Sequence, residues 1–263
     1  MRERIPYCGE DPVTRTDQRP VRLALAVGLF GLSAFYAGTH VLVRAQPTPP
    51  RHPITGRQIA GIATDAGWLD RITREQEEAP EQALDLIGVA PGMVVADVGA
   101  GSGYMTTRLA RRVGPTGRVY ANDLQPAMLE IVRRKAAQGG LSNIETIQGT
   151  ETDAQLPEGA VDLVLMVDVY HEMWQPQAML RSLRRALKPG GRLILVEYRK
   201  EDRSIPIADT HRMSVADVRT EVEAEGFRFD RVIPGLPRQH IIVFTAPASA
   251  AAAAPAPRRP AAP

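Results

Sequence analysis

A glycine loop between an apolar stretch and a helical stretch is the part of the sequence best suited to chemistry. It reads VVADVGAGSGY over residues 94–104. Glycines permit positive φ angles and let a ligand approach the main chain closely. The spacing G-x-G-x-G differs from the dinucleotide fingerprint G-x-G-x-x-G, and no Lys-Ser/Thr pair follows as in a phosphate-binding P-loop. Close packing of a strand on a helix also selects glycine, so the loop alone does not identify a ligand.

Two carboxylates narrow the choice of ligand. Asp97 directly precedes the loop, where a negative charge is unfavourable beside a phosphate and favourable beside a cation. Asp123 ends the next apolar stretch, where a carboxylate can accept hydrogen bonds from the hydroxyls of a ribose. A ligand that is both cationic and ribose-bearing is S-adenosylmethionine. The loop and its two carboxylates therefore predict a site for this cofactor.

The elements that must position these residues alternate along the chain. Short continuous apolar runs predict buried strands, and apolar positions at helical spacing predict helices between them. Such alternation indicates a mostly parallel sheet covered on both faces, closed here by a C-terminal hairpin. The expected strands are 93–98, 118–122, 144–148, 161–168, 192–198, 227–233 and 240–245, and the expected helices are 59–72, 80–87, 104–112, 126–138, 176–187 and 214–225.

Three segments resemble the class I S-adenosylmethionine-dependent methyltransferases. VVADVGAGSGY is similar to their first motif, VYAND to the acidic end of their second strand, and LKPGGRLILVEY to their fifth-strand motif. The resemblance covers about residues 54–246 and implies an α/β, Rossmann-like, doubly wound seven-stranded sheet with a C-terminal antiparallel hairpin. HPITGRQIA and WLDRITREQEE resemble a bacterial subgroup of undefined substrate with a type 11-like domain. Residues 86–123 also look like protein isoaspartate methyltransferases, a likeness confined to the cofactor half.

The resemblance implies a part of the cofactor for each matching residue. It places Asp97 near the amino group, the loop around the methionine part, Asp123 on the ribose and Leu124 on the adenine. Residues 152–153 would reach the adenine amino group, although GTETDAQLP is one residue shorter than the commoner form of that loop. The first helices would form a lid with Arg71 or Arg74 facing the site. The implied cofactor-binding set is Asp97, Gly99, Ala100, Gly101, Gly103, Asp123, Leu124, Thr152 and Asp153.

The candidate catalytic residues are Asp168, His171 and His211. Methyl transfer from a sulfonium is an in-line displacement, so the protein mainly supplies proximity and orientation. A general base is needed only if the acceptor must lose a proton. Asp168 and His171 lie in DVYHEM after the fourth strand, and His211 lies in the connection KEDRSIPIADTHRMS that follows the fifth. Each has a structural alternative: Asp168 as a turn cap, His171 packed against Trp174, and His211 as a solvent-facing loop residue.

Composition narrows the choice of partner. The 263-residue chain carries a net charge of +2, but residues 46–246 hold 24 basic and 26 acidic residues. A slightly acidic body with 5% aromatic residues argues against a nucleic-acid partner, as does DVYH where amino-methylating nucleic-acid enzymes carry Asn/Asp-Pro-Pro-aromatic. No His/Cys/Asp cluster has metal-ligand spacing, so no metal is expected. Cys8, the single cysteine, excludes an internal disulfide framework. A small-molecule methyl acceptor remains.

The N-terminal region predicts a membrane segment. Residues 23–43 contain no Asp, Glu, Lys or Arg, and about 20 apolar residues suffice to cross a bilayer. Five arginines precede the segment and three follow at similar distance, which predicts a cytoplasmic N-terminus and an exported, periplasmic body. Cleavage after residues 43–45 as a signal peptide is the alternative. A body on the cytoplasmic face also remains open, because S-adenosylmethionine is made in the cytoplasm.

The sequence thus predicts a definite organisation and two competing functions. The regions are a basic N-terminal region (1–22), a transmembrane anchor or signal core (23–43), a Pro-rich linker (44–53), a methyltransferase domain (54–246) and a disordered Ala/Pro tail (247–263). The first function is transfer of the methyl group of S-adenosylmethionine to a small organic acceptor. The second is a catalytically silent S-adenosylmethionine-binding domain at the cell envelope.

Overall fold

The computed structural model describes residues 50–247. The hydrophobic segment predicted at 23–43 lies outside the described residues, as does the tail beyond 247. Within 50–247, every helix is too short or too polar to cross a bilayer.

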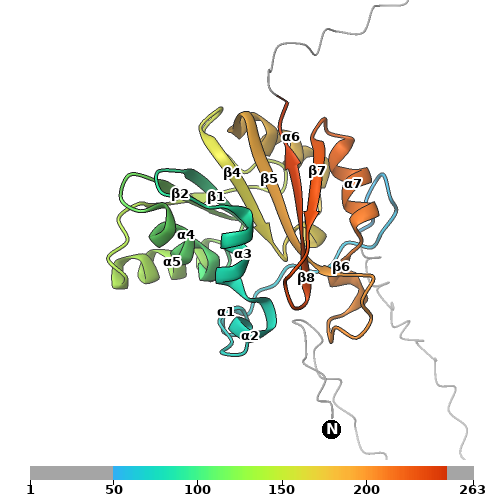
Figure 1. Cartoon of the computed structure of the whole chain (residues 1–263), viewed down its shortest axis with the longest axis horizontal. Helices are drawn as coiled ribbons and strands as arrows, with labels where there is room; N and C mark the ends of the chain where they lie inside the picture. Colours follow the sequence, from blue (N-terminus) through green and yellow to red (C-terminus); the bar gives the residue numbers. More distant parts are fainter. Residues whose placement is uncertain (1–49, 248–263) are drawn as a thin grey trace, which may run out of the picture. The chain divides into compact units, whose positions relative to one another are not determined.

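A single mixed sheet forms the centre of the described part (Figure 1). Its strands are ordered β3-β2-β1-β4-β5-β8-β7, and the first five of these pair in parallel. Strand β8 runs antiparallel between β5 and β7, so the predicted architecture with a closing hairpin is confirmed. A two-residue strand, β6, pairs with β5 outside this order and adds an eighth strand. The bounds are β1 Val94–Val98, β2 Arg118–Asp123, β3 Ile144–Gln148, β4 Val161–Val167, β5 Leu187–Arg199, β6 Arg212–Met213, β7 Arg228–Ile233 and β8 Gln239–Thr245.

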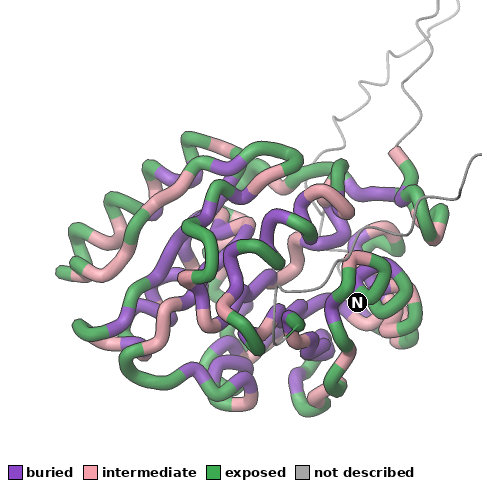
Figure 2. The backbone as a smooth tube through the Cα atoms, turned by 90° about the horizontal axis from the view of Figure 1, so that it is seen from above, coloured by how far each residue is buried: buried purple, intermediate pink, exposed green. Residues whose placement is uncertain are grey.

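Helices cover both faces of the sheet. One core packs α3 and α4 on one face, and a second packs α6 and α7 on the other. Buried residues are accordingly concentrated along the central strands, with the exposed ones on the outer sides of the helices (Figure 2). The bounds are α1 Ala66–Leu69, α2 Arg74–Glu78, α3 Pro80–Ile87, α4 Tyr104–Val113, α5 Pro126–Gln138, α6 Pro176–Ala186 and α7 Val215–Glu223, with 3-10 turns η1 Tyr170–Glu172 and η2 Asp209–His211.

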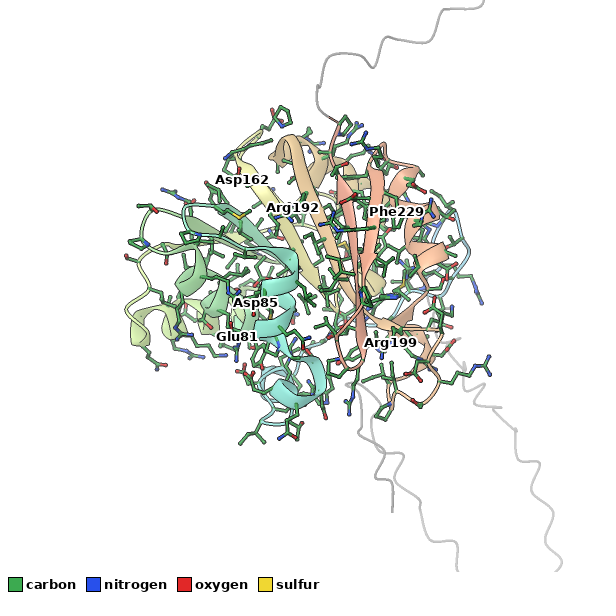
Figure 3. The ribbon with its side chains drawn as sticks, in the orientation of Figure 1. Glu81, Asp85, Asp162, Arg192, Arg199 and Phe229 are labelled. Carbon is green, nitrogen blue, oxygen red and sulfur yellow. The ribbon has the colours of Figure 1, made fainter. Side chains whose placement is uncertain are left out.

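Local sequence explains where most helices begin. Proline occupies the first turn of α3, α5 and α6, where its missing N–H is no loss and its fixed φ suits a helix. The Ser214 side chain accepts a hydrogen bond from the Asp217 N–H at the start of α7, as a capping residue does. Glu81 and Asp85 lie on α3 (Figure 3), and both pair with Arg112 of α4, so the two helices are held together.

Two predicted elements differ in the structure. The helix expected over 59–72 is wrong, because only α1 is helical there. The backbone before α1 bonds to distant parts instead: the Ala60 N–H donates to the His171 carbonyl and the Ala63 N–H to the Glu172 carboxylate. The strand expected over 192–198 begins earlier, because β5 extends from Leu187 to Arg199 and its pairing with β4 is irregular between Val161 and Leu163.

A buried carboxylate in α7 holds the extended segment 50–60. Glu221 is fully buried and pairs with Arg57 at 2.8 Å and with His52 at 3.2 Å, and it accepts a hydrogen bond from Thr55. Because one helix residue makes all these contacts, its loss would leave the buried guanidinium of Arg57 without its anionic partner.

We expect Glu221→Ala to lower the free energy of unfolding by about 3 kcal/mol, the lower end of the usual cost of breaking a buried ion pair. That corresponds to a fall in Tm of about 10 °C for a domain of this size. Thermal unfolding by circular dichroism measures it. The control is Glu223→Ala on the same helix: its partner Arg219 is 3.5 Å away and both are exposed, so the cost is at most about 1 kcal/mol. Equal losses in the two variants would contradict the assignment.

Candidate active site

A cavity opens at the carboxyl ends of β1, β2 and β4. It measures about 1130 Å³ including the space at its mouth. Strand order changes direction between β1 and β4, and such a switch point is where open α/β sheets bind ligands. Its walls include residues 97–102, 122–125, 149–151 and 167–169, together with Ile62, Ala63, Trp68, Leu69 and Arg74 from the N-terminal segment.

The glycine loop forms the floor of this cavity, and two of its glycines have no room for a side chain. Gly99 has φ +74° and Gly101 has φ +52°. A Cβ at Gly99 would lie 2.3 Å from Val169 Cγ2, and one at Gly101 would lie 2.8 Å from Leu69 Cδ1. Both positions therefore require glycine, and the main chain of the loop can contact a ligand in the cavity directly. Gly103 does not line the cavity; it caps the N-terminus of α4.

Asp123 is buried at the end of β2 and still has acceptor capacity. Its Oδ2 accepts a hydrogen bond from the Gly101 N–H and its Oδ1 from the Gln125 N–H, both at 2.8 Å. Each carboxylate oxygen can accept a second hydrogen bond, so the two oxygens can take two adjacent hydroxyls. Burial raises the pKa of this carboxyl above its usual range. Its environment therefore fits a ribose diol.

Asp97 supplies a negative charge to the cavity wall. Its side chain is 2% exposed, and Oδ2 accepts a hydrogen bond from Thr106 Oγ1 at 2.5 Å. Burial raises its pKa to about 6, against the effects of the Thr106 hydrogen bond and the Arg74 charge. The carboxyl is therefore ionised at neutral pH and can attract an ammonium or sulfonium group.

The remaining predicted cofactor residues divide into two groups. Ala100 and Leu124 line the cavity, and Leu124 is 36% exposed, as an apolar surface for a flat ring would be. Thr152 and Asp153 do not line it: the Asp153 carboxylate accepts from Ser182 Oγ and pairs with Arg185 instead. Their neighbours at 150–151 occupy the wall in their place.

The lid contributes one of the two expected arginines. Arg74 is buried and lines the cavity, donating to Glu78 at 2.7 Å and to the Leu69 carbonyl at 2.8 Å. Arg71 points elsewhere, pairing with Glu78 and stacking on Trp68 with its guanidinium carbon 3.7 Å from the ring centroid. Helices α1 and α2, which carry them, lie together beyond the start of α3 (Figure 1).

Asp168 follows β4 in an unusual conformation. It has φ +52°, a strained value for a residue with a side chain. Its Oδ2 accepts a hydrogen bond from Gln239 at 2.6 Å, while Oδ1 is buried and has no hydrogen-bond partner among residues 50–247. Burial, and next the charges of Glu78 and Glu197, raise its pKa well above the usual range. Asp168 also lines the cavity, so it can exchange a proton with a bound molecule.

His171 and His211 lie behind the cavity wall rather than in it. His171 Nδ1 is 2.6 Å from Glu197 Oε2, and its Nε2 is 3.0 Å from His211 Nδ1. Burial disfavours the charged His171 ring, but Glu197 outweighs it and raises the pKa; burial, and next the His171 charge, lower the pKa of His211 to about 3. The alternative of a solvent-facing His211 is wrong, since it is 8% exposed.

Sequence reasoning missed several residues of this region. Glu197, the fixed partner of His171, directly follows the continuous apolar residues 193–196 of the fifth-strand motif. An acidic residue directly after a buried apolar run was the available signal. Gln125, which donates to the Ala63 carbonyl and so holds the N-terminal segment over the cavity, left no such signal.

Fold and site together define a Rossmann-like domain that binds a cationic nucleoside. A family model described as "Methyltransferase domain" matches residues 95–191. The crystal structure of a SAM-dependent methyltransferase from Aquifex aeolicus is 30% identical with TM-score 0.65, covering 69% of this chain and 96% of that one. The chain belongs to the class I S-adenosylmethionine-dependent methyltransferases, and S-adenosylmethionine is its cofactor.

Other relatives are similar to the chain at lower identity or over a shorter part of their length. A putative type 11 methyltransferase from Sulfolobus solfataricus shares the fold at 24% identity and TM-score 0.55, covering 66% of this chain and 95% of that one. The ubiquinone/menaquinone biosynthesis C-methyltransferase UbiE of Ectopseudomonas mendocina is 30% identical over 152 residues, 56% of this chain and 59% of the relative. That of Pseudomonas fluorescens is 34% identical over 119 residues, 45% and 46% respectively. The chain thus spans about half the length of these curated relatives.

Proposed function

We propose that the chain is an active methyltransferase whose acceptor is a small hydroxylated aromatic ring of the quinol type, methylated on carbon. The observation that carries this proposal is Asp168, whose carboxyl has one buried oxygen without a hydrogen-bond partner among residues 50–247, on the cavity wall. A phenolic hydroxyl must lose its proton before the ring becomes a strong carbon nucleophile, and a carboxyl with a raised pKa is a suitable base. The names of the UbiE relatives, C-methyltransferases of quinone biosynthesis, support the choice of ring.

The cavity has walls suited to such a ring. Trp174 is 48% exposed, and Met173 and Met179 line the same wall. Aromatic and methionine side chains offer a flat apolar surface and adaptable packing, respectively. An aromatic acceptor would therefore find apolar contacts close to the Asp168 carboxyl.

Each of these residues would have a separate role in the proposed reaction. S-Adenosylmethionine, when bound, supplies an activated methyl group on a sulfonium. Asp123 would hold the ribose hydroxyls, Asp97 the positively charged end and Arg74 the carboxylate. Asp168 would take the acceptor proton. The N-terminal segment, held over the cavity through Gln125, would exclude water from the reacting atoms.

An acceptor screen tests the proposal. Purified chain, S-adenosylmethionine and a panel of hydroquinones, naphthols and catechols are assayed for release of S-adenosylhomocysteine, with aliphatic amines and thiols as comparison acceptors. We expect turnover with the hydroxylated rings and a new carbon-bound methyl signal by NMR. Cofactor binding without turnover on any acceptor would instead favour a catalytically silent binding domain.

Cofactor affinity should depend on pH through Asp97. Its pKa of about 6 applies to the free protein, and a cationic ligand binds the ionised carboxylate more tightly than the neutral acid. The affinity for the cofactor is therefore highest above pH 7 and falls as the pH drops through 6. Well below pH 6 it falls by about tenfold for each pH unit. Calorimetry between pH 5 and 8 measures the slope. Asp97→Asn should bind weakly and with a flatter profile; a wild-type profile as flat as that of the variant would contradict this role.

A further inference from the structure

We propose that His171, Glu172 and His211 bind one divalent transition-metal ion of the zinc type. The three residues come from η1 and η2, and His211 lies forty residues beyond His171 in the chain. Spacing along the sequence gave no sign of such a site, because strand β5 separates the two turns and only the fold brings them together. This inference does not depend on the identity of the methyl acceptor.

The three donor atoms have the separations that one ion requires. His171 Nε2 and His211 Nδ1 are 3.0 Å apart, and Glu172 Oε1 lies 3.8 Å from the first and 4.0 Å from the second. The point equidistant from these atoms is about 2.1 Å from each, and zinc bonds to nitrogen and oxygen measure about 2.0–2.2 Å. An ion therefore fits between them with little movement.

An unpaired carboxylate oxygen is an independent observation in favour of a cation-binding site. Glu172 is 6% exposed; its Oε2 accepts a hydrogen bond from the Ala63 N–H, while Oε1 is buried without a hydrogen-bond partner among residues 50–247. Burying a carboxylate oxygen without a donor is costly. A metal ion at the equidistant point would satisfy this oxygen.

Glu197 completes the arrangement typical of metal-binding histidines. Its Oε2 holds His171 Nδ1 at 2.6 Å, and its Oε1 accepts from the Tyr170 N–H at 2.9 Å. A carboxylate on one ring nitrogen fixes the ring so that the other nitrogen faces the metal. Glu197 thus orients the Nε2 of His171 toward the cluster.

The ligand set selects the kind of ion. Two imidazole nitrogens and one carboxylate suit zinc and its first-row neighbours, whereas magnesium and calcium prefer oxygen ligands throughout. Three protein ligands leave a fourth position for water or another molecule. Glu172 also lines the cofactor cavity, so the ion would lie at the edge of that cavity.

Zinc titration of the chelator-treated full chain tests the site. We expect one Zn²⁺ per chain in competition with a chromophoric chelator, and no competition by Mg²⁺. Glu172→Gln keeps an oxygen for the Ala63 N–H but should weaken Zn²⁺ binding at least about 100-fold. Glu197→Gln should weaken it about 10- to 100-fold. Glu151→Gln, at an exposed carboxylate on the cavity wall, should bind Zn²⁺ like the wild type.

A second measurement on the wild type keeps the proposal testable if a variant fails to fold. In long-range ¹H–¹⁵N spectra, Zn²⁺ should shift the ring signals of His171 and His211 and leave those of His240 unchanged. Co²⁺ should give visible d–d absorption without a thiolate charge-transfer band. No saturable one-to-one binding, unchanged ring signals, or a thiolate band from Cys8 would each overturn the proposal. Without an ion, one of the two nitrogens, His171 Nε2 or His211 Nδ1, would instead donate a hydrogen bond to the other.

Discussion

Replacing Asp123 by alanine is expected to weaken S-adenosylmethionine binding by about 1000-fold while the domain stays folded. The carboxylate is 6% exposed, so hydrogen bonds made there do not compete with bulk water. Two hydrogen bonds from ribose hydroxyls to a charged acceptor contribute about 1.5–3 kcal/mol each, and about 4 kcal/mol corresponds to 1000-fold in Kd. Calorimetry on wild type and variant measures the ratio directly.

Asp153→Ala is the informative control for this experiment. The family resemblance implies a cofactor contact at Asp153, but its carboxylate is engaged by Ser182 and Arg185 outside the cavity wall. We therefore expect a change in Kd below about threefold. The loss of the Asp123 bonds to the Gly101 and Gln125 N–H groups is checked by thermal unfolding in the absence of cofactor. A folded Asp123→Ala variant with wild-type affinity would refute the ribose assignment.

The elements that position the cofactor were predictable because their signals are local. The continuous apolar run 163–166 is buried in β4 on both faces, and it predicts a strand without any knowledge of its neighbours. Pro126 and the glycines at 139–140 bracket α5 in the same way. Once β1 and β2 are adjacent and parallel, Asp97 and Asp123 must lie near one edge of the sheet.

The N-terminal segment could not be predicted, because distant residues determine its conformation. Apolar residues at 59, 62, 66, 69 and 72 have helical spacing, yet Ile72 is 92% exposed in the structure. The Ala60 N–H donates to the His171 carbonyl instead of to a carbonyl of its own turn. Asp65 accepts hydrogen bonds from the N–H groups of residues 67 and 68 and starts the helix later than expected.

The histidine cluster shows the same limit at the level of the site. DVYHEM marks His171 as a candidate, but nothing in that motif connects it with His211 or with Glu197. The contact between the two histidines requires η2 to fold back against η1, and the contact with Glu197 requires β5 to lie beside β4. Chemistry built from three separate segments becomes visible only when the strand order is known.

Asp168→Asn is expected to lower kcat by about 1000-fold on a hydroxylated aromatic acceptor, within the usual range for loss of a general base. The amide keeps an oxygen that can accept from Gln239, which now bonds Asp168 Oδ2 at 2.6 Å. It cannot accept a proton, so the acceptor hydroxyl would have to ionise unaided. Because the acceptor loses only one hydrogen-bond partner, KM should change by less than about tenfold.

Two further measurements separate a catalytic Asp168 from a structural one. Cofactor affinity should stay within about threefold of wild type, because the residues expected to hold the ribose and the charged end are Asp123 and Asp97. Acceptors of lower hydroxyl pKa, such as nitrophenols, should recover part of the lost rate, since their ionised form no longer needs a base. A residue that served only as a turn cap after β4 would lose rate equally on all acceptors, and rate loss of that kind would remove Asp168 from the reaction.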